Sequence, residues 1–486
     1  MADAAQPSPF TPPKAAGSRT PLQDKDNGTS SDGNGLGFVT LTCLVIANMI
    51  GAGVFTSSGY SIGTLGSPGQ VMLAWVLCGV WAFCGAVGYG ALVKRLPDSG
   101  GEYLFLSRLV HPSVGFLAGW ISMISGFTAP ISAAALGAAI YCLPGTPEDA
   151  WQLKLLAVLL IAAATACHLV GVSLGTRIQN IVVIAKMLLI AITIAWALAF
   201  TDPAAWQGSV TANVGSDWIP QDFSAWLVFV GSMSWIALSY TGFNAAIYVA
   251  GESTRARVLV PRAMIIGTLV VTAIYWLLNY VYVYAPPADA IAFQGDVATI
   301  AVESIGGSSL SFVVRCTIVL SMTSSVFAML LAGPRVYQKM AEDKVLPGAF
   351  VGKRGAPTLA ILTQASLSVV ALLSANLLQL MTYLGLTLSA CGALAVLSLF
   401  WIQSRLPDSK PLQLSESLCT YIYLGSTLCI LAASAHQRPT EFIAMLVTFG
   451  VGLLVYAIWQ STTGASSRPP MESDAEESDA KSLQSA

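Results

Sequence analysis

Two short stretches place groups that can bind a polar solute within otherwise apolar sequence. Gly51-Ala52-Gly53 interrupts the run from Phe38 to Tyr60, and Ser239-Tyr240-Thr241-Gly242-Phe243-Asn244 interrupts a second run. Glycine lets the backbone leave a helix, and N–H or C=O groups freed in hydrocarbon are costly unless protein, water or a ligand satisfies them. Each break therefore predicts a ligand-binding cavity, as in solute transporters. The alternative is that the glycines only permit close helix packing.

Lys186 is the third feature with chemical potential. It stands about nine residues into the apolar run 178–200, which is roughly 13 Å along a helix axis. A lysine stem can extend part of that distance toward the membrane surface. Ionisable residues inside a membrane segment are nevertheless functional by default. We therefore expect Lys186 to act either as a fixed charge or as a group that gains and loses a proton.

The composition identifies the elements that must position these groups. The chain has 486 residues, 55% hydrophobic and 10% charged, with a mean hydropathy of +0.69. Soluble domains carry about 25% charged residues, so we expect an all-α polytopic membrane protein. Runs of about 20 apolar residues predict twelve spans, at 37–60, 70–93, 113–140, 153–171, 178–200, 224–250, 263–285, 310–334, 357–377, 379–402, 417–436 and 440–460. Residues 289–308 predict a short amphipathic helix, and residues 1–36 and 461–486 predict disordered tails.

Basic residues in the loops predict the orientation. With both termini in the cytoplasm, 19 of the 23 Lys and Arg residues fall on the cytoplasmic side, as the positive-inside rule requires. The outside receives only Lys154 and Arg438, while Lys186 and Arg315 lie within spans.

The two breaks also predict an internal repeat. They lie five spans apart, so the second broken helix enters the membrane in the opposite direction to the first. An inverted repeat of five plus five helices, the LeuT-like arrangement, has discontinuous first and sixth helices that cross at the substrate site. We expect a transporter domain at 37–460, with repeats at about 37–200 and 224–402 and two further helices at 417–460.

Four motifs follow one another along the chain: Ile50-Gly51-Ala52-Gly53-Val54-Phe55; Pro97-Asp98-Ser99-Gly100-Gly101-Glu102-Tyr103; Ser239 to Asn244 with Gly251-Glu252-Ser253 and Pro261-Arg262-Ala263; and Gly333-Pro334-Arg335 with Met340-Ala341-Glu342-Asp343 and Leu346-Pro347. Together they resemble the amino acid–polyamine–organocation (APC) superfamily, nearest to the L-type amino acid transporters and their bacterial relatives. The resemblance implies a secondary active transporter of amino acids that works by alternating access.

The resemblance also implies residue roles. The N–H groups of Ala52 and Gly53 would bind the substrate carboxylate, and the carbonyls of Met49, Leu238 and Thr241 its ammonium group. Leu238, Phe243 and Asn244 would select the side chain. The other lining residues would be Ile50, Gly51, Ser239, Tyr240 and Gly242. Lys186 with Ser324 and Ser325 would occupy the place of a coupling sodium ion. Glu102, Glu252 and Arg262 would form a cytoplasmic gate.

These roles favour sodium-independent exchange or proton-coupled uptake of neutral amino acids, because no carboxylate lies in the first or sixth span to pair with a cationic side chain. An amino-acid sensor and a transporter of amines or polyamines remain alternatives. The chain has no enzyme, metal-binding or Walker motif, and its net charge of −2 does not favour nucleic acid. No cofactor is expected, and the plasma membrane is the expected location. A glycoprotein partner attached through Cys142 is the less favoured arrangement.

Overall fold

The computed structural model describes residues 36–98, 100–169, 176–200, 218–342, 345–351, 358–407 and 409–463, and all regular elements in these ranges are helical. In chain order they are α1 (Phe38–Met49), α2 (Ala52–Leu65), α3 (Pro68–Arg95), α4 (Gly101–Leu109), α5 (Pro112–Ile121), the π-helix η1 (Ser122–Thr128), α6 (Ala129–Cys142), α7 (Trp151–Leu169), α8 (Thr176–Phe200), α9 (Phe223–Tyr240), the 3₁₀-helix η3 (Ala245–Glu252), α10 (Ala256–Tyr284), α11 (Ala288–Ile291), α12 (Val297–Glu342), the 3₁₀-helix η4 (Gly348–Phe350), α13 (Thr358–Ser374), α14 (Leu377–Leu397), the 3₁₀-helix η6 (Ser398–Trp401), α15 (Ile402–Arg405), α16 (Leu414–Gln437) and α17 (Pro439–Thr463).

The helices confirm the expected class of polytopic membrane protein. Within the described ranges, nine helices are long and apolar enough to cross a membrane, and the bent pair α1–α2 makes a tenth span. Two further expected spans fall on shorter apolar helices, Ile184–Ala197 and Thr358–Ser374. The count of twelve and the internal repeat therefore stay predictions.

Two helix boundaries differ from those expected. α10 begins at Ala256 rather than at 263, because its first turns contain Arg257 and Arg262 and were therefore left out of the apolar run that was counted. The expected amphipathic helix at 289–308 is divided between the short α11 and the first turns of α12. α12 then changes direction at Gly307, whose φ of 69° and ψ of −171° are not helical.

Local sequence explains where several spans begin. The side chain of Ser67 accepts a hydrogen bond from the N–H of Gln70, and Pro68 occupies the first turn of α3. Asp222 caps α9 in the same way, through the N–H of Ala225. Both arrangements satisfy N–H groups that a helix start leaves without partners. They help to fix where α3 and α9, which both pack around the broken helices, begin.

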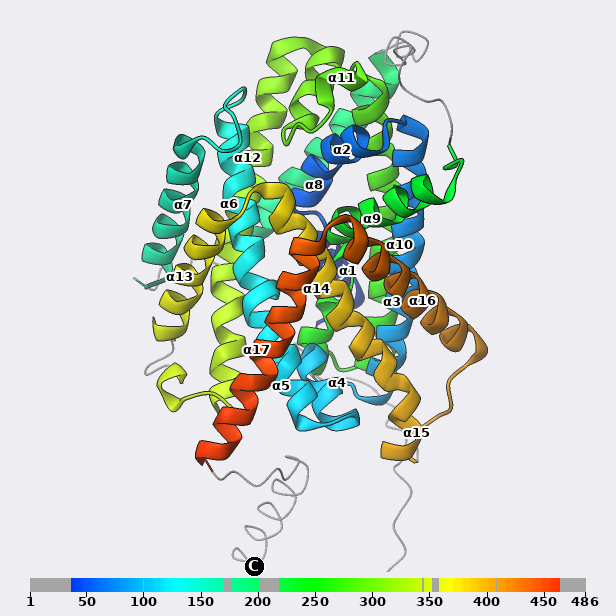
Figure 1. Cartoon of the computed structure of the whole chain (residues 1–486), viewed down its shortest axis with the longest axis vertical. Helices are drawn as coiled ribbons and strands as arrows, with labels where there is room; N and C mark the ends of the chain where they lie inside the picture. Colours follow the sequence, from blue (N-terminus) through cyan, green and yellow to red (C-terminus); the bar gives the residue numbers. More distant parts are fainter. Residues whose placement is uncertain are drawn as a thin grey trace, which may run out of the picture. The chain divides into compact units, whose positions relative to one another are not determined.

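The broken helix α1–α2 lies among α3, α9 and α10. α2 contacts α3, α9 and α10, and α1 contacts α10. In Figure 1 the two halves are the dark blue segments, with α2 extending toward α11 and α1 toward α4. We call the two ends of this helix bundle the α11 end and the α4 end. α6, α12 and α13 contact one another beside this group.

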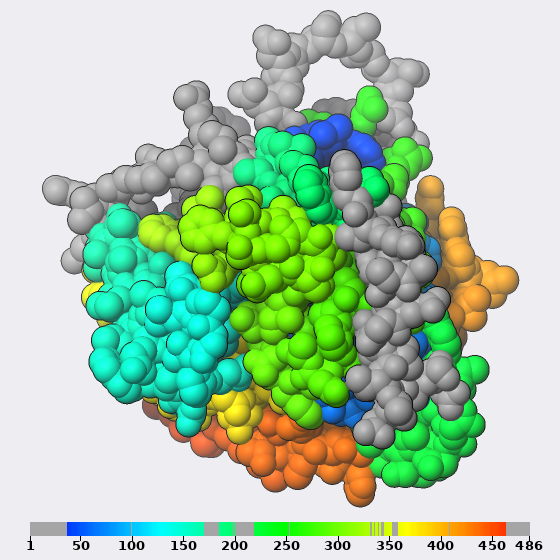
Figure 2. All heavy atoms as spheres, turned by 90° about the horizontal axis from the view of Figure 1, so that it is seen from above, coloured from blue at the N-terminus to red at the C-terminus, as the bar shows by residue number. Residues whose placement is uncertain are grey.

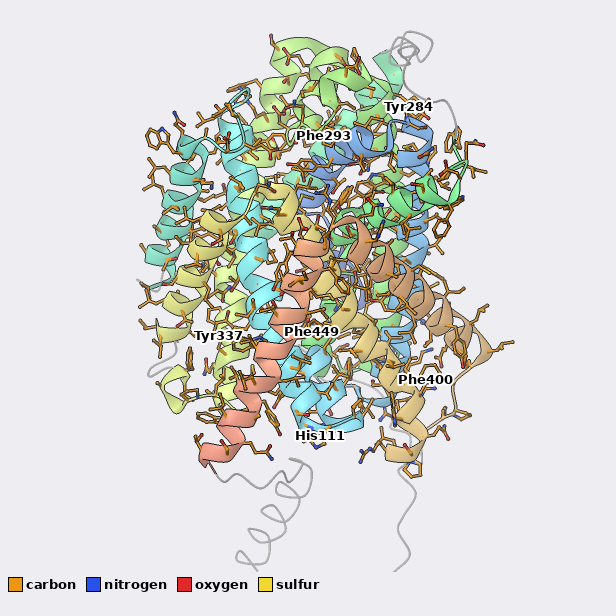
Figure 3. The ribbon with its side chains drawn as sticks, in the orientation of Figure 1. His111, Tyr284, Phe293, Tyr337, Phe400 and Phe449 are labelled. Atoms are coloured by element: carbon orange, nitrogen blue, oxygen red, sulfur yellow. The ribbon has the colours of Figure 1, made fainter. Side chains whose placement is uncertain are left out.

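The broken helix is covered at the α11 end. The N–H of Phe293 donates to the carbonyl of Gly59 in α2 at 2.8 Å, and Figure 3 shows Phe293 beside the blue α2 ribbon. The view onto this end shows the yellow-green segment that includes α12 beside the cyan α6–α7 segment (Figure 2), which α12 also contacts. Tyr60 is only 3% exposed, whereas Asn48, at the end of α1, is exposed. At these two positions the α1 half of the broken helix is the more exposed.

Candidate functional site

The first break frees the carbonyl of Ile50, and Lys186 binds it. α1 ends at Met49, and Ile50 leaves helical geometry with φ −78° and ψ 86°. The Nζ atom of Lys186 in α8 donates to the Ile50 carbonyl at 2.5 Å, and the lysine is 4% exposed. Lys186 forms no ion pair with any residue that the structure describes. An ammonium group thus lies against the break, 136 positions away in sequence.

The start of α2 presents backbone donors. Gly51, the residue before α2, is extended, with φ −119° and ψ −156°, and no side chain caps the helix. The first N–H groups of a helix have no partner within it, and they carry the positive end of the helix dipole. Ala52 and Gly53 are therefore placed to bind an anionic group, such as a carboxylate.

The second break supplies one unused acceptor. α9 ends at Tyr240, and the carbonyl of Leu238 accepts hydrogen bonds from the N–H of Thr241 at 3.0 Å and its hydroxyl at 2.6 Å. The carbonyl of Met49 is likewise occupied, by the N–H of Gly51 at 2.9 Å and the hydroxyl of Tyr275 at 2.6 Å. The Thr241 carbonyl accepts no hydrogen bond from the described residues. Of the three expected ammonium acceptors, Thr241 is the one that is available.

The two breaks touch each other. A Cβ atom added to Gly242 would lie 2.9 Å from the carbonyl carbon and oxygen of Asn48, and one added to Gly53 would lie 2.4 Å from Oγ of Ser239. The hydroxyl of Tyr275 in α10 also bonds the Ser239 carbonyl, at 2.9 Å, in addition to that of Met49. Tyr275 thus joins both broken helices. Sequence reasoning missed it because one tyrosine in an aromatic-rich span carries no distinguishing signal.

Three expected lining residues have other partners. The Phe243 ring, 4% exposed, packs against Trp81, Tyr89 and Tyr423. The hydroxyl of Tyr240 donates to the carbonyl of Trp75 at 2.9 Å. The amide of Asn244 donates to the carboxylate of Glu102 at 2.5 Å. Leu238 is the third residue expected to select the substrate side chain. It is partly exposed, and its apolar side chain forms no hydrogen bond.

The expected ion-coupling serines bond within their own helix, and the expected gating residues form no ion pair with one another in the described part of the structure. The hydroxyls of Ser324 and Ser325 both donate to the Ser321 carbonyl of their own helix, at 2.7 and 3.1 Å. Glu102 forms no ion pair within the described ranges. Arg262 is exposed, and the side chain of Glu252 lies outside the described part of the structure.

A carboxylate lies at the α11 end of the site. The hydroxyl of Tyr60 donates to Glu148 at 2.6 Å. Burial raises the pKa of Glu148 above its ordinary value; the Tyr60 hydrogen bond opposes this rise and the charge of Asp296 adds to it. Glu148 lies in the loop after α6, and Cys142 at the end of α6 is an exposed free cysteine.

Comparisons with known proteins agree with these features. Residues 36–471 match the family described as "Amino acid permease". The serine/threonine exchanger SteT of Bacillus subtilis is 27% identical over 371 residues, covering 73% of this chain and 79% of the relative. The mouse b(0,+)-type amino acid transporter 1 is 25% identical, covering 87% of each chain. The rat large neutral amino acids transporter small subunit 2 is 25% identical, covering 86% of this chain and 78% of the relative.

Proposed function

Because the chain belongs to the amino acid permease family, we propose that it transports neutral amino acids independently of sodium, by exchange or with protons. The observation that carries this proposal is the buried ammonium of Lys186 on the Ile50 carbonyl. A carbonyl freed by a helix break is the kind of group that coordinates a coupling sodium ion in broken-helix transporters. Here the Lys186 ammonium group occupies that carbonyl, so a sodium ion would lack this ligand and would be repelled by the neighbouring positive charge.

The backbone supports binding of a zwitterion. The uncapped start of α2 offers donors for a carboxylate, and the Thr241 carbonyl offers an acceptor for an ammonium group. Names of two relatives refer to serine and threonine or to large neutral amino acids. Among the side chains that the structure describes, the carboxylate beside the second break is that of Glu102, and it already accepts hydrogen bonds from three side chains. Within the described part of the chain, a cationic substrate side chain would thus find no carboxylate at this break free of other hydrogen bonds, which favours neutral substrates.

The transport cycle follows from the closed α11 end. We infer that the α4 end faces the cytoplasm, since the basic loops collect there, and that the protein lies in the plasma membrane. Substrate would reach the breaks from the α1 side in this conformation. The cover formed by Phe293 and Gly59 would separate in the opposite conformation.

A membrane glycoprotein partner is a separate matter. The name of one relative, a "small subunit", points to an assembly of that protein. Here Cys142 is an exposed free cysteine that could form a disulfide bond, but the prolines at 144 and 147 do not match the pattern of heteromeric transporters. We therefore propose that the chain works without such a partner.

Uptake of labelled neutral amino acids into proteoliposomes tests the proposal. Wild type and Lys186→Ala would be compared in sodium or choline buffer, with and without internal amino acid, and with and without an inward proton gradient. We expect equal wild-type uptake in sodium and choline, and strongly reduced uptake by Lys186→Ala. Dependence on internal substrate would identify an exchanger, and concentrative uptake driven by the gradient a proton symporter. A sodium requirement, or absence of uptake for all neutral amino acids, would contradict the proposal. Uptake of amines instead, or binding without uptake, would favour an amine transporter or a sensor.

A further inference from the structure

A buried carboxylate lies beside the second break, and no cation pairs with it among the residues that the structure describes. Glu102, in α4, is 7% exposed. Its Oε1 atom accepts hydrogen bonds from the Tyr89 hydroxyl at 2.9 Å and the Asn244 amide at 2.5 Å, and its Oε2 atom from the Tyr248 hydroxyl at 2.6 Å. Hydrogen bonds to a charged acceptor are stronger than neutral ones. Three uncharged donors therefore take the place of an ion pair.

The three donors come from different parts of the chain. Tyr89 belongs to α3, Asn244 ends the unwound stretch of the second break, and Tyr248 belongs to the 3₁₀-helix η3. Glu102 itself lies in the first turn of α4. A single carboxylate thus joins α3, α4 and the segment 241–252, which is formed by the unwound stretch and η3.

The first turn of α4 approaches the Tyr248 side chain of the 241–252 segment closely at Gly101. Gly101 has φ +61°, and a Cβ atom there would lie 2.3 Å from the Tyr248 ring. A larger residue would therefore be strained and would also separate α4 from η3. On the other side, the Phe243 ring lies 5.7 Å from that of Tyr89 in α3. η3 also packs against α10 and α1, so contacts with several neighbouring helices, rather than its own helical geometry, hold this segment.

The segment needs such support because its internal hydrogen bonding is weak. A four-residue turn with φ +96° at Gly242 leads into η3, in which Val249 is not helical. A 3₁₀-helix has poorer hydrogen-bond geometry than an α-helix. The same segment carries the available Thr241 carbonyl. The position of that carbonyl therefore depends on what holds Asn244 and Tyr248.

We propose that Glu102 is a positioning residue for the substrate site: its carboxylate holds the 241–252 segment on α3 and α4, so that these parts move as one unit. This inference concerns the site of the proposed function and rests on it for its effect on substrate. In this proposal Asn244 holds the segment on α4 and does not select the substrate side chain. Glu102 does not itself touch substrate.

Glu102→Gln and Tyr248→Phe are the informative variants. The first keeps the size of the side chain but replaces one acceptor oxygen by an amide donor, and the second removes one donor without changing the ring. Asp98→Asn is the matched control: Asp98 lies just before α4, its side chain is 55% exposed, and it pairs with Arg108. Each purified full-length variant would first be checked for the same melting behaviour as wild type.

Hydrogen–deuterium exchange without substrate measures the tether directly. We expect exchange in peptides covering 241–252 to be about tenfold faster in Glu102→Gln and in Tyr248→Phe, because losing one bond to a charged group shifts local opening by about that factor. Asp98→Asn should exchange as wild type does. Unchanged exchange in both Glu102→Gln and Tyr248→Phe would overturn the inference. If Glu102→Gln fails to fold, Tyr248→Phe alone decides.

Equilibrium binding of a labelled neutral amino acid then tests the link to substrate. We expect the Kd to rise about tenfold in Glu102→Gln. The double variant Glu102→Gln/Tyr248→Phe should bind the amino acid as tightly as Glu102→Gln alone, because both substitutions remove the same tether. Additive losses, or a wild-type Kd in Glu102→Gln, would refute the positioning role. If wild type binds no neutral amino acid, the proposed function fails, while the exchange experiment still decides whether the tether exists.

Discussion

Gly51 and Gly53 lie two positions apart at the first break, yet alanine should have different effects at the two. At Gly53 the new Cβ atom would lie 2.4 Å from Oγ and 3.0 Å from both Cα and Cβ of Ser239. The Cα atom belongs to the backbone of α9 and cannot rotate away, so α2 and α9 must separate. At Gly51 no atom lies within 4 Å of the added Cβ, and its φ of −119° suits any residue.

The magnitude follows from overpacking. Inserting a methyl group into a filled interface costs about 1–3 kcal/mol, which is roughly a 5- to 150-fold change in an equilibrium constant. We expect Gly53→Ala to lose that much unfolding free energy and to lose uptake. Gly51→Ala should stay within about 0.5 kcal/mol of wild type.

Denaturant-induced unfolding of the purified protein, measured in one detergent for all variants, gives the comparison. Ser239→Gly supplies a rescue, because it removes two of the three closest atoms and should return part of the stability lost in Gly53→Ala. If Gly53→Ala is as stable as wild type, or if Gly51→Ala is equally destabilised, the packing argument is wrong. A loss that Ser239→Gly does not relieve would also place its cause elsewhere.

Two further predictions concern hydrogen bonds of the site and its cover. Tyr275→Phe removes the hydroxyl that bonds the carbonyls of Met49 and Ser239; a buried carbonyl left without a donor costs about 1–3 kcal/mol, so the same unfolding assay should show that loss, and wild-type stability would contradict the bridging role. Glu148, which accepts from Tyr60, has its pKa raised by burial, so the folded state binds its proton more tightly than the unfolded state does. The contribution of Glu148 to the free energy of unfolding is fully present below the ordinary pKa of about 4.5, and it is lost as the pH rises above that value. Melting temperature measured against pH should therefore decline more steeply in wild type than in Glu148→Gln, and parallel curves would refute this assignment.

Much of the fold could be predicted because membrane insertion acts on local sequence. A run of about 20 apolar residues must span the bilayer as a helix, whatever its neighbours are. Glycines and a polar stretch within such runs likewise mark a local interruption, and the structure has breaks at Ile50–Gly51 and at 241–244. The ends of α10 and α12 were less predictable, since both helices extend into polar sequence that hydropathy does not count as span.

The candidate site was predicted less completely because its partners are distant in sequence. Sequence marked Lys186 as a buried charge in a membrane segment, but its acceptor, the Ile50 carbonyl, is a backbone atom that no residue pattern identifies. Asn244 shows the same limit. Its position in the break suggests contact with substrate, which stays a prediction, while its hydrogen bond to Glu102 in a different helix could not be predicted from the sequence.

By itself the sequence determined an all-helical membrane protein, the location of its two breaks and one lysine within a span, because hydrophobic burial and backbone freedom are properties of contiguous residues. Only the tertiary structure decided which freed groups remain available. Tyr275, Lys186 and Glu102 come from three other helices and occupy or hold groups at the two breaks, so that the start of α2 and the Thr241 carbonyl are left for a ligand. Hydrogen bonds of this kind depend on distance in space and direction, and neither is encoded in local order along the chain.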